Sequence, residues 1–316
     1  MTLPMGRAMR EIFGETVAEL ANDDPRIVML DGDVGSSTRA DIFEKAHPDR
    51  YLQMGIAEQN MLGAAAGMAT MGLIPFISTF VSFAVVRPLD QIRVLIAQTG
   101  ANVKITAGYA GLFTGQTGMS HIIVDDMTIM RAMPGMVSVA PADDVEARAA
   151  LRWAASYTGP TYIRLVRDAT QRLFDASYEF VFGAAVVVRE GRDVTLISTG
   201  TQTPRVVDAA DLLAADGIDA HVLHVPTLKP IDMPAIVAAA ERTGRVITVE
   251  EHSVIGGLGG AVAETLSQHR PTVVDRIGLQ DVYPESGPND ALLDIYGLSA
   301  TRVAEQVRQL LRGATA

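Results

Sequence analysis

The residue best placed to do chemistry is a glutamate, Glu58, which precedes a run of very small side chains. That run is built from Gly63, Ala64, Ala65, Ala66, Gly67, Ala69 and Gly72. Burial of a carboxylate costs free energy unless another group satisfies it. Small side chains also let a backbone, a second protein chain or a flat cofactor approach closely. Glu58 is therefore predicted to be a functional acid at a crowded interface.

A second segment with chemical potential is the glycine-punctuated loop 108–121, which combines polar side chains with one histidine, His121. Loops held by a rigid scaffold often carry function. On its own, however, His121 is better explained by a structural hydrogen bond. Phe80 and Phe83, three residues apart, are likewise explained by a hydrophobic core. These residues indicate a site and leave their roles open.

Short apolar strands alternating with helices must position these residues. Strands are expected at residues 26–30, 103–107, 137–140 and 161–166, and helices at 9–20, after Pro88 and, capped by Asp143, up to 156. The helix after Pro88 is expected to turn four side chains inward: Leu89, Ile92, Leu95 and Ile96. The alternation predicts an α/β fold, with a doubly wound parallel sheet covered by helices on both faces.

The pattern becomes irregular between residues 171 and 190 and then restarts. Strands are expected at 194–199, 220–225, 245–249 and 272–277, with a helix at 203–215. We therefore predict two doubly wound domains, residues 1–175 and a smaller one at 188–316. The glycine cluster 256–260 lacks the spacing of a dinucleotide-binding loop and is interpreted as close packing.

Composition excludes several classes of function. The net charge of −11 over 316 residues argues against nucleic acid as a partner. The absence of cysteine excludes thiolate nucleophiles and cysteine metal sites, and no paired-histidine zinc signature occurs, so no metal site is predicted in this chain. No membrane segment is expected, because glycines and Pro75 interrupt the apolar stretch 61–83. A cytoplasmic enzyme is the expectation.

A series of motifs occurs in a characteristic order along nearly the whole chain. They are Gly6-Arg7 in the first helix, Asp31-Gly32-Asp33 with Ser37, Gly55-Ile56-Ala57-Glu58-Gln59, Thr79-Phe80 with Phe83, Arg87, Asp90-Gln91-Ile92-Arg93, Val103-Lys104-Ile105, Glu250-Glu251-His252 and Ser286-Gly287. Because these motifs occur in this order, the chain resembles the C-terminal two-thirds of transketolase. The resemblance implies a thiamine diphosphate pyrimidine-binding domain followed by a transketolase C-terminal domain, and transfer of a two-carbon ketol unit between sugar phosphates.

The resemblance also implies roles for individual residues. Glu58 corresponds to the glutamate that hydrogen-bonds N1′ of the cofactor's aminopyrimidine, and His121 to a residue that reaches the donor hydroxyls; both are expected to be catalytic. Ile56, Phe80 and Phe83 correspond to cofactor-contacting positions, where aromatic faces provide stacking.

Substrate contacts are implied in the same way. Arg7, Ser37 and Arg167 match positions that hold the substrate phosphate, although Arg7 is equally well explained as a solvated helix residue. Two positions depart from the family: Tyr109 replaces a common histidine and Thr117 a usual aspartate. Loss of a charged acceptor should alter recognition of substrate hydroxyls. We therefore expect substrates other than the xylulose and ribose phosphates of the pentose pathway.

The chain lacks the Gly-Asp-Gly motif with which the family binds the diphosphate and its metal, and Asp31-Gly32-Asp33 is no substitute because its order and context differ. A partner of the N-terminal transketolase type, here called the diphosphate-binding subunit, is expected to hold the diphosphate with Mg²⁺ or Ca²⁺ in an α2β2 assembly. This chain would then be the C-terminal, pyrimidine-binding subunit of a split transketolase.

Three alternatives remain open. One is a fragment similar to 1-deoxyxylulose-5-phosphate synthase, which normally has arginine at the position of Phe83. Another is a 2-oxo acid dehydrogenase beta-type subunit, whose sequence differs around the glutamate. The third is a non-catalytic scaffold, disfavoured because Glu58, Phe80, Phe83 and His121 are all present.

Overall fold

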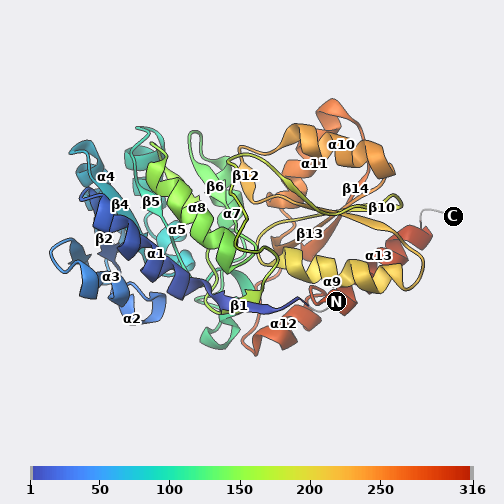
Figure 1. Cartoon of the computed structure of the whole chain (residues 1–316), viewed down its shortest axis with the longest axis horizontal. Coiled ribbons are helices and arrows are strands. Elements are labelled where there is room, and N and C mark those ends of the chain that lie inside the picture. Colours follow the sequence, from blue (N-terminus) through green and yellow to red (C-terminus); the bar gives the residue numbers. More distant parts are fainter. Residues whose placement is uncertain (1–2, 314–316) are drawn as a thin grey trace.

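A computed structural model describes residues 3–313 and contains two α/β domains side by side (Figure 1). The predicted fold class is confirmed. The strands of the first domain are β1 (Met5–Ala8), β2 (Ile27–Asp31), β3 (Tyr51–Gln53), β4 (Ile74–Ser78), β5 (Lys104–Ile105), β6 (Val137–Val139), β7 (Thr161–Ile163) and β8 (Ala169–Gln171). Its helices are α1 (Met9–Asp23), α2 (Gly35–Thr38), α3 (Asp41–Ala46), α4 (Glu58–Thr70), α5 (Val81–Val86), α6 (Leu89–Gln91), a π-helix (Ile92–Ala97), a 3-10 helix (Gly111–Thr117), α7 (Asp126–Ala132) and α8 (Asp144–Ser156).

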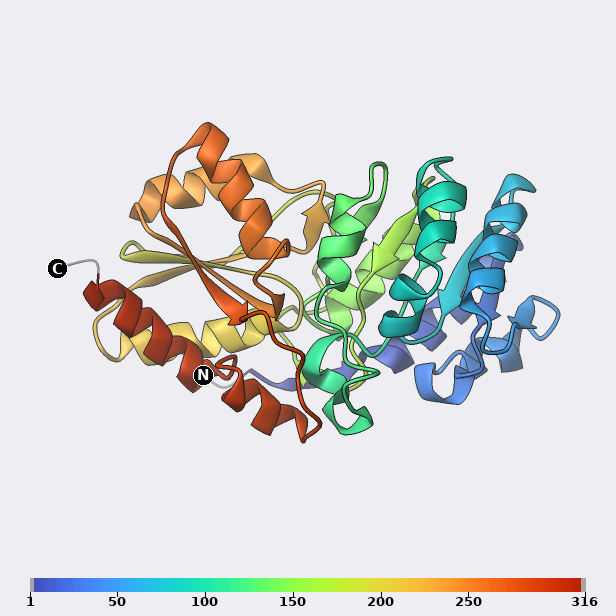
Figure 2. The ribbon, with the colours of Figure 1, turned by 180° about the vertical axis from the view of Figure 1, so that it is seen from behind.

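Strands β6, β7, β5, β4, β2 and β3 form the parallel part of the first sheet, in that order. Helices α1 and α8 cover one face, and α4, α5 and α7 cover the other (Figures 1 and 2). The predicted cap of α8 is confirmed, because the Asp143 side chain accepts a hydrogen bond from the Glu146 amide.

The second domain contains strands β9 (Val186–Arg189), β10 (Val194–Ser198), β11 (Ala220–His224), β12 (Thr227–Lys229), β13 (Val246–Ser253) and β14 (Val274–Leu279). Its helices are α9 (Gln202–Ala214), α10 (Met233–Thr243), α11 (Leu258–His269), α12 (Asn289–Ile295) and α13 (Ala300–Gly313). The sheet order is β14-β13-β10-β11-β9, parallel except for β9. Helices α10 and α11 lie on one face and α9 and α13 on the other (Figure 1).

In addition to the connecting chain, a strand pairing and a buried hydrogen-bond network join the two domains. Strand β12 of the second half adds antiparallel to β6, at the edge of the first domain's sheet. A buried polar network also crosses the boundary, where His224 contacts Glu146 at 2.8 Å and the Thr203 hydroxyl at 2.7 Å. Such fully paired buried groups favour a fixed relative placement of the domains.

The glycine cluster 256–260, which spans the start of α11, packs closely, as predicted. The Glu250 carboxylate accepts hydrogen bonds from the amides of Leu258 and Gly259, at 2.7 and 2.8 Å. A Cβ atom on Gly257 would collide with the Glu250 carboxylate, so the position requires glycine. The buried carboxylate takes the place that a ligand would need, which agrees with packing rather than dinucleotide binding.

Two local predictions are wrong. Gly6-Arg7 lies in strand β1, paired antiparallel with β8, rather than in the first helix. The helix after Pro88 buries Ile92 and Ile96 but leaves Leu89 37% and Leu95 41% exposed. The spacing of apolar residues predicts a helix but does not show how many of its apolar side chains the core of this chain covers. Among the described helices, none is long and apolar enough to cross a bilayer.

Lys104 of β5 is fully buried, and its ammonium group donates to the carbonyls of Tyr157 at 2.7 Å and Gly159 at 2.9 Å. Burial lowers the pKa of Lys104 from 10.5 to about 7. Above about pH 7 the unfolded chain therefore binds more protons at this site, so the group's contribution to the free energy of unfolding rises with pH. We expect the difference in unfolding free energy between wild type and Lys104→Met to grow in favour of wild type from about pH 7 to pH 9. Chemical denaturation at each pH measures this difference, and a flat difference would contradict it.

Candidate active site

The residues predicted to form a site follow the carboxyl ends of neighbouring parallel strands. Ser37 follows β2, Glu58 follows β3, Phe80 follows β4, Tyr109 follows β5 and Arg167 follows β7. The carboxyl ends of parallel strands meet at one edge of the sheet, where α/β proteins bind ligands. The fold thus gathers side chains that lie far apart in the sequence.

Glu58 is the first residue of α4 and is only 4% exposed, although it lines a surface cavity of about 520 Å³ with Ile56 and Arg87. Its Oε1 atom accepts a hydrogen bond from Arg87 Nη1 at 2.8 Å. Ile56 beside it is 74% exposed, an unusual state for an isoleucine. The structure therefore places a nearly buried carboxylate in an open surface cavity beside an exposed isoleucine.

An unbroken row of planar groups runs from Glu58 to the next cavity. The Arg87 guanidinium lies over the Phe83 ring, 3.9 Å from its centroid. Phe83 meets His121 edge-on at 5.1 Å, and His121 lies 5.7 Å from Phe80. Phe80 is in turn stacked on Tyr109 at 3.9 Å. The structure thus brings together predicted residues from helix α5 and from the glycine-rich loop.

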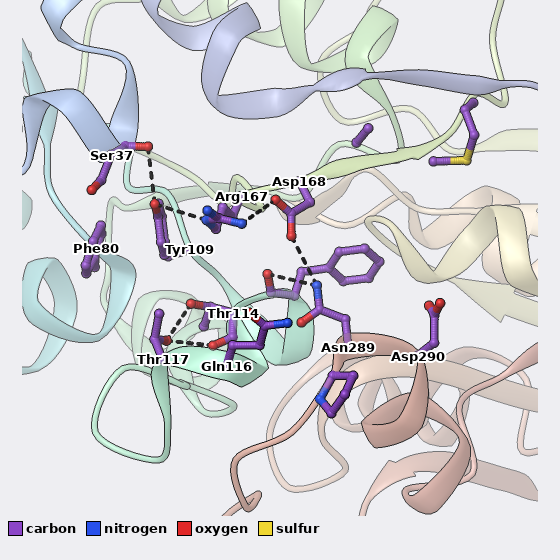
Figure 3. A pocket seen from close by; sticks show the side chains of 14 residues that line it. Ser37, Phe80, Tyr109, Thr114, Gln116, Thr117, Arg167, Asp168, Asn289 and Asp290 are labelled. Atoms are coloured by element: carbon purple, nitrogen blue, oxygen red, sulfur yellow. Dashed lines mark hydrogen bonds and ion pairs between the residues drawn. The ribbon is translucent and has the colours of Figure 1, made fainter.

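A second cavity, of about 760 Å³, opens at the far end of this row (Figure 3). The first domain supplies most of its lining and α12 of the second domain supplies the rest. Its labelled residues are Ser37, Phe80, Tyr109, Thr114, Gln116, Thr117, Arg167, Asp168, Asn289 and Asp290. Four predicted substrate residues, Ser37, Tyr109, Thr117 and Arg167, therefore share one cavity.

The Tyr109 hydroxyl is the centre of a polar cluster in this cavity. It donates to the Ser37 carbonyl at 3.3 Å and accepts from Arg167 Nε at 3.2 Å. Arg167 Nη1 also donates to Asp168 Oδ1 at 2.7 Å, and the Tyr109 hydrogen bond together with the Asp168 charge raises the pKa of Arg167. Tyr109 has φ = 67°, a strained conformation for a residue other than glycine. Strain of this kind is often found at functional sites.

The side chains of Thr117 and His121 make hydrogen-bonding contacts within the glycine-rich loop 108–121. The Thr117 hydroxyl donates to the Thr114 carbonyl at 2.6 Å and lies 2.7 Å from the Thr114 hydroxyl. The His121 Nδ1 atom lies 3.0 Å from the Ser120 hydroxyl. A His121 ring held at Nδ1 presents its other nitrogen, Nε2, for further contacts.

Arg7 is not brought to this cavity. Its guanidinium donates to both carboxylate oxygens of Glu15, at 2.6 and 2.8 Å, and to Glu11 at 3.3 Å. It lines a separate groove with Arg148 and Arg172, between α1 and α8. The structure thus separates Arg7 from the four residues that share the larger cavity.

Sequence reasoning missed the acidic and amide side chains of the larger cavity: Asp168, Asp290 and Asn289. Asp168 adjoins Arg167, and Asn289 follows the Ser286-Gly287 motif by two residues. Their closeness in sequence to residues that match the family was the only sign that they belong to the site. Nothing in the local sequence indicated that α12 reaches the first domain.

Asp31 and its neighbours have a structural role. The buried Asp31 carboxylate accepts from the Ser78 hydroxyl at 2.8 Å and from the Val34 amide at 3.0 Å, and burial raises its pKa. Within residues 3–313, no group of three or more His, Asp or Glu side chains is arranged to hold a metal ion.

The two domains match two family models in order. Residues 5–172 match the model described as transketolase, pyrimidine binding domain, and residues 183–303 match that of transketolase, C-terminal domain. The chain therefore belongs to the transketolase family. Thiamine diphosphate is the cofactor that this family implies.

Similar proteins include single subunits of transketolases. The chain is 39% identical to the 6-deoxy-6-sulfo-D-fructose transketolase subunit SqwH of Clostridium sp. (strain MSTE9), covering 96% of this chain and 94% of that protein. It is 36% identical to one subunit of the apulose-4-phosphate transketolase of Phocaeicola vulgatus, covering 96% and 98%. A solved structure described as a split gene transketolase, inactive beta4 tetramer, superposes with a TM-score of 0.89 at 44% identity, covering 97% and 99%.

Proposed function

We propose that this chain is the pyrimidine-binding subunit of a heteromeric, thiamine diphosphate-dependent transketolase that transfers a two-carbon ketol unit between sugar phosphates. The observation that carries the proposal is the nearly buried Glu58 carboxylate at the start of the row Arg87, Phe83, His121 and Phe80. A carboxylate beside aromatic faces suits a flat, nitrogen-containing ring that both hydrogen-bonds and stacks.

The residues of this row fit the pyrimidine end of thiamine diphosphate. Glu58 offers carboxylate oxygens, and its hydrogen-bond partner Arg87 is itself a planar nitrogen donor stacked on Phe83. The same arrangement suits an aminopyrimidine. Glu58, Phe80, Phe83 and Ile56 would hold that ring, and the bound cofactor supplies a carbon that stabilises the charge of the transferred unit.

Each side chain then has a defined task. Glu58 would hold a proton at its carboxyl oxygen toward N1′ of the ring. His121 would hydrogen-bond the hydroxyls of the donor substrate. The apolar faces of Phe80 and Phe83 would exclude water and thereby strengthen the hydrogen bond of Glu58.

The larger cavity is proposed as the substrate pocket. Arg167 supplies the cationic group for an anionic substrate end, while Ser37, Tyr109 and Thr117 supply hydroxyls. Arg167 already pairs with Asp168, so the net charge offered to the substrate is smaller than a free arginine would give. Arg7, engaged by Glu15, could contribute only after releasing that partner. The relatives are named for two chemically different ketoses, which supports substrates outside the pentose pathway.

We propose that the diphosphate and its Mg²⁺ or Ca²⁺ are held by the N-terminal-type, diphosphate-binding subunit in an α2β2 assembly. Support comes from exposed apolar side chains beside Glu58 and on the helices between residues 81 and 97: Ile56, Val86, Leu89 and Leu95. Gly63 and Gly67 of α4 have open space where a Cβ would point, which allows close approach of another chain. The structural neighbour described as an inactive beta4 tetramer supports the need for a second kind of chain.

A substrate screen tests the proposed activity. The chain is co-expressed with a candidate diphosphate-binding subunit from the same organism, and the complex is assayed with thiamine diphosphate, Mg²⁺ and a panel of ketose and aldose phosphates. We expect two-carbon transfer from at least one ketose, detected by mass spectrometry as a ketose two carbons longer than the aldose acceptor together with an aldose two carbons shorter than the donor. Transfer of a one- or three-carbon unit, or decarboxylation of 2-oxo acids alone, would contradict the proposal.

A further inference from the structure

The side chain of Asn289 lies between two parts of the substrate pocket (Figure 3). We propose that Asn289 is a positioning residue for ketol transfer, through which the C-terminal domain holds the loop 111–118 and the Asp168 carboxylate in place. This inference rests on the proposed function, because it assigns the larger cavity to the substrate.

The amide of Asn289 uses both of its hydrogen-bonding ends. Its Nδ2 atom donates to Asp168 Oδ2 at 3.2 Å and to the Phe113 carbonyl at 3.3 Å. Its Oδ1 atom accepts from the Gly115 amide at 3.1 Å. A carboxylate of the same shape could accept but not donate, so an amide is required here.

Backbone groups of the loop 111–118 form further hydrogen bonds with the C-terminal domain. The Gly287 amide donates to the Gly115 carbonyl at 3.1 Å, and a Cβ atom on Gly115 would collide with Leu292 and the Gly287 carbonyl. Glu251 of β13 accepts from the Leu112 amide at 2.6 Å. Backbone groups at the start and in the middle of this loop, at Leu112 and Gly115, are thus satisfied by the second domain, and the loop carries Gln116 and Thr117 into the pocket.

The Nδ2 atom of Asn289 is linked to the Arg167 guanidinium of the pocket through the Asp168 carboxylate. Asp168 pairs with Arg167, so Asn289 limits the positions that the Asp168 carboxylate, and with it the Arg167 guanidinium, can adopt. Of the residues proposed to hold the cofactor ring, Phe80 lines this cavity, whereas Glu58, Phe83 and Ile56 are not among its described lining residues. A change at Asn289 should therefore alter substrate binding more than the function of the cofactor.

The test compares Asn289→Asp with the matched control Asn102→Asp in the complex with the diphosphate-binding subunit, thiamine diphosphate and Mg²⁺. Asn102 also accepts a backbone hydrogen bond, from the Gly159 amide at 3.2 Å, and lines neither cavity. Both variants keep the acceptor, but only Asn289→Asp removes the donated bonds and adds a negative charge beside Asp168. We expect KM for the ketose donor to rise about tenfold and kcat to change less than about threefold, with the control within about twofold on both.

A second substitution distinguishes positioning from general damage. Asp168→Asn in the Asn289→Asp background returns a donor to the pair and should recover at least about a third of the lost kcat/KM. In the free chain, Asn289→Ala should speed hydrogen exchange at the Gly115 amide about tenfold while exchange at the Leu112 amide stays unchanged.

The possible outcomes separate the role of Asn289 from the proposed function of the protein. Equal KM values for Asn289→Asp and Asn102→Asp, or unchanged hydrogen exchange at the Gly115 amide, would overturn the role of Asn289. If the wild-type complex is active in the same experiment, the proposed function is unaffected by that result. A wild-type complex that transfers no ketol unit would overturn the proposed function, and the exchange result would then describe the loop alone.

Discussion

Glu58→Gln is expected to lower kcat for ketol transfer by roughly 10²–10⁴-fold while leaving the fold intact. Glutamine preserves the shape of the side chain but cannot take up or release a proton. Its amide also cannot form the charged pair with Arg87. The Arg87 side chain is 44% exposed, so loss of the pair should change stability little. Steady-state kinetics of the complex and thermal unfolding of the variant chain measure the two effects.

The matched control is Glu264→Gln. Glu264 is a carboxylate of α11 that also pairs with an arginine, Arg131 at 2.8 Å, and it lines neither cavity. This substitution removes a comparable ion pair and should leave kcat within about twofold of wild type. If Glu58→Gln retained more than about a tenth of wild-type kcat, the role of Glu58 would be wrong.

The second large effect is expected from omitting the partner: this chain by itself should show no ketol transfer with thiamine diphosphate and Mg²⁺. Its described residues hold no cluster for a metal, and Asp31 is committed to Ser78 and Val34. The exposed Ile56, Leu89 and Leu95 should be covered when the diphosphate-binding subunit docks. Hydrogen exchange of α4 and of residues 89–97 should accordingly slow in the complex.

Leu89→Glu tests this interface separately from the chemistry. A charge placed on a surface buried by a partner is strongly unfavourable unless it is paired. We expect weaker association and activity that recovers at high concentrations of the diphosphate-binding subunit. Unchanged association would place the interface elsewhere on the chain.

The architecture could be predicted from the sequence because local patterns determined it. Buried strands such as β2 and β10 are short and mostly apolar, and α8 follows a capping aspartate, Asp143. Once alternating strands and helices imply a parallel sheet, convergence of Ser37, Phe80 and Tyr109 at its carboxyl edge follows from topology.

The rest depends on contacts between distant segments. Gly6-Arg7 forms a strand because β8, at residues 169–171, pairs with it, and local preference carries no sign of that partner. The pairing of β12 with β6 is equally remote. Asn289 reaches the pocket through packing of α12 on the loop 111–118, which no periodicity in either segment indicates.

On the function proposed here, Glu58 belongs to half of an active site, which a second chain completes. The most direct measurement is a titration of this chain into a fixed amount of the diphosphate-binding subunit, with thiamine diphosphate, Mg²⁺ and a ketose donor present, following ketol transfer. We predict no activity from either chain alone and a rise that saturates when the two chains are equimolar. Transfer by this chain without its partner would contradict the claim.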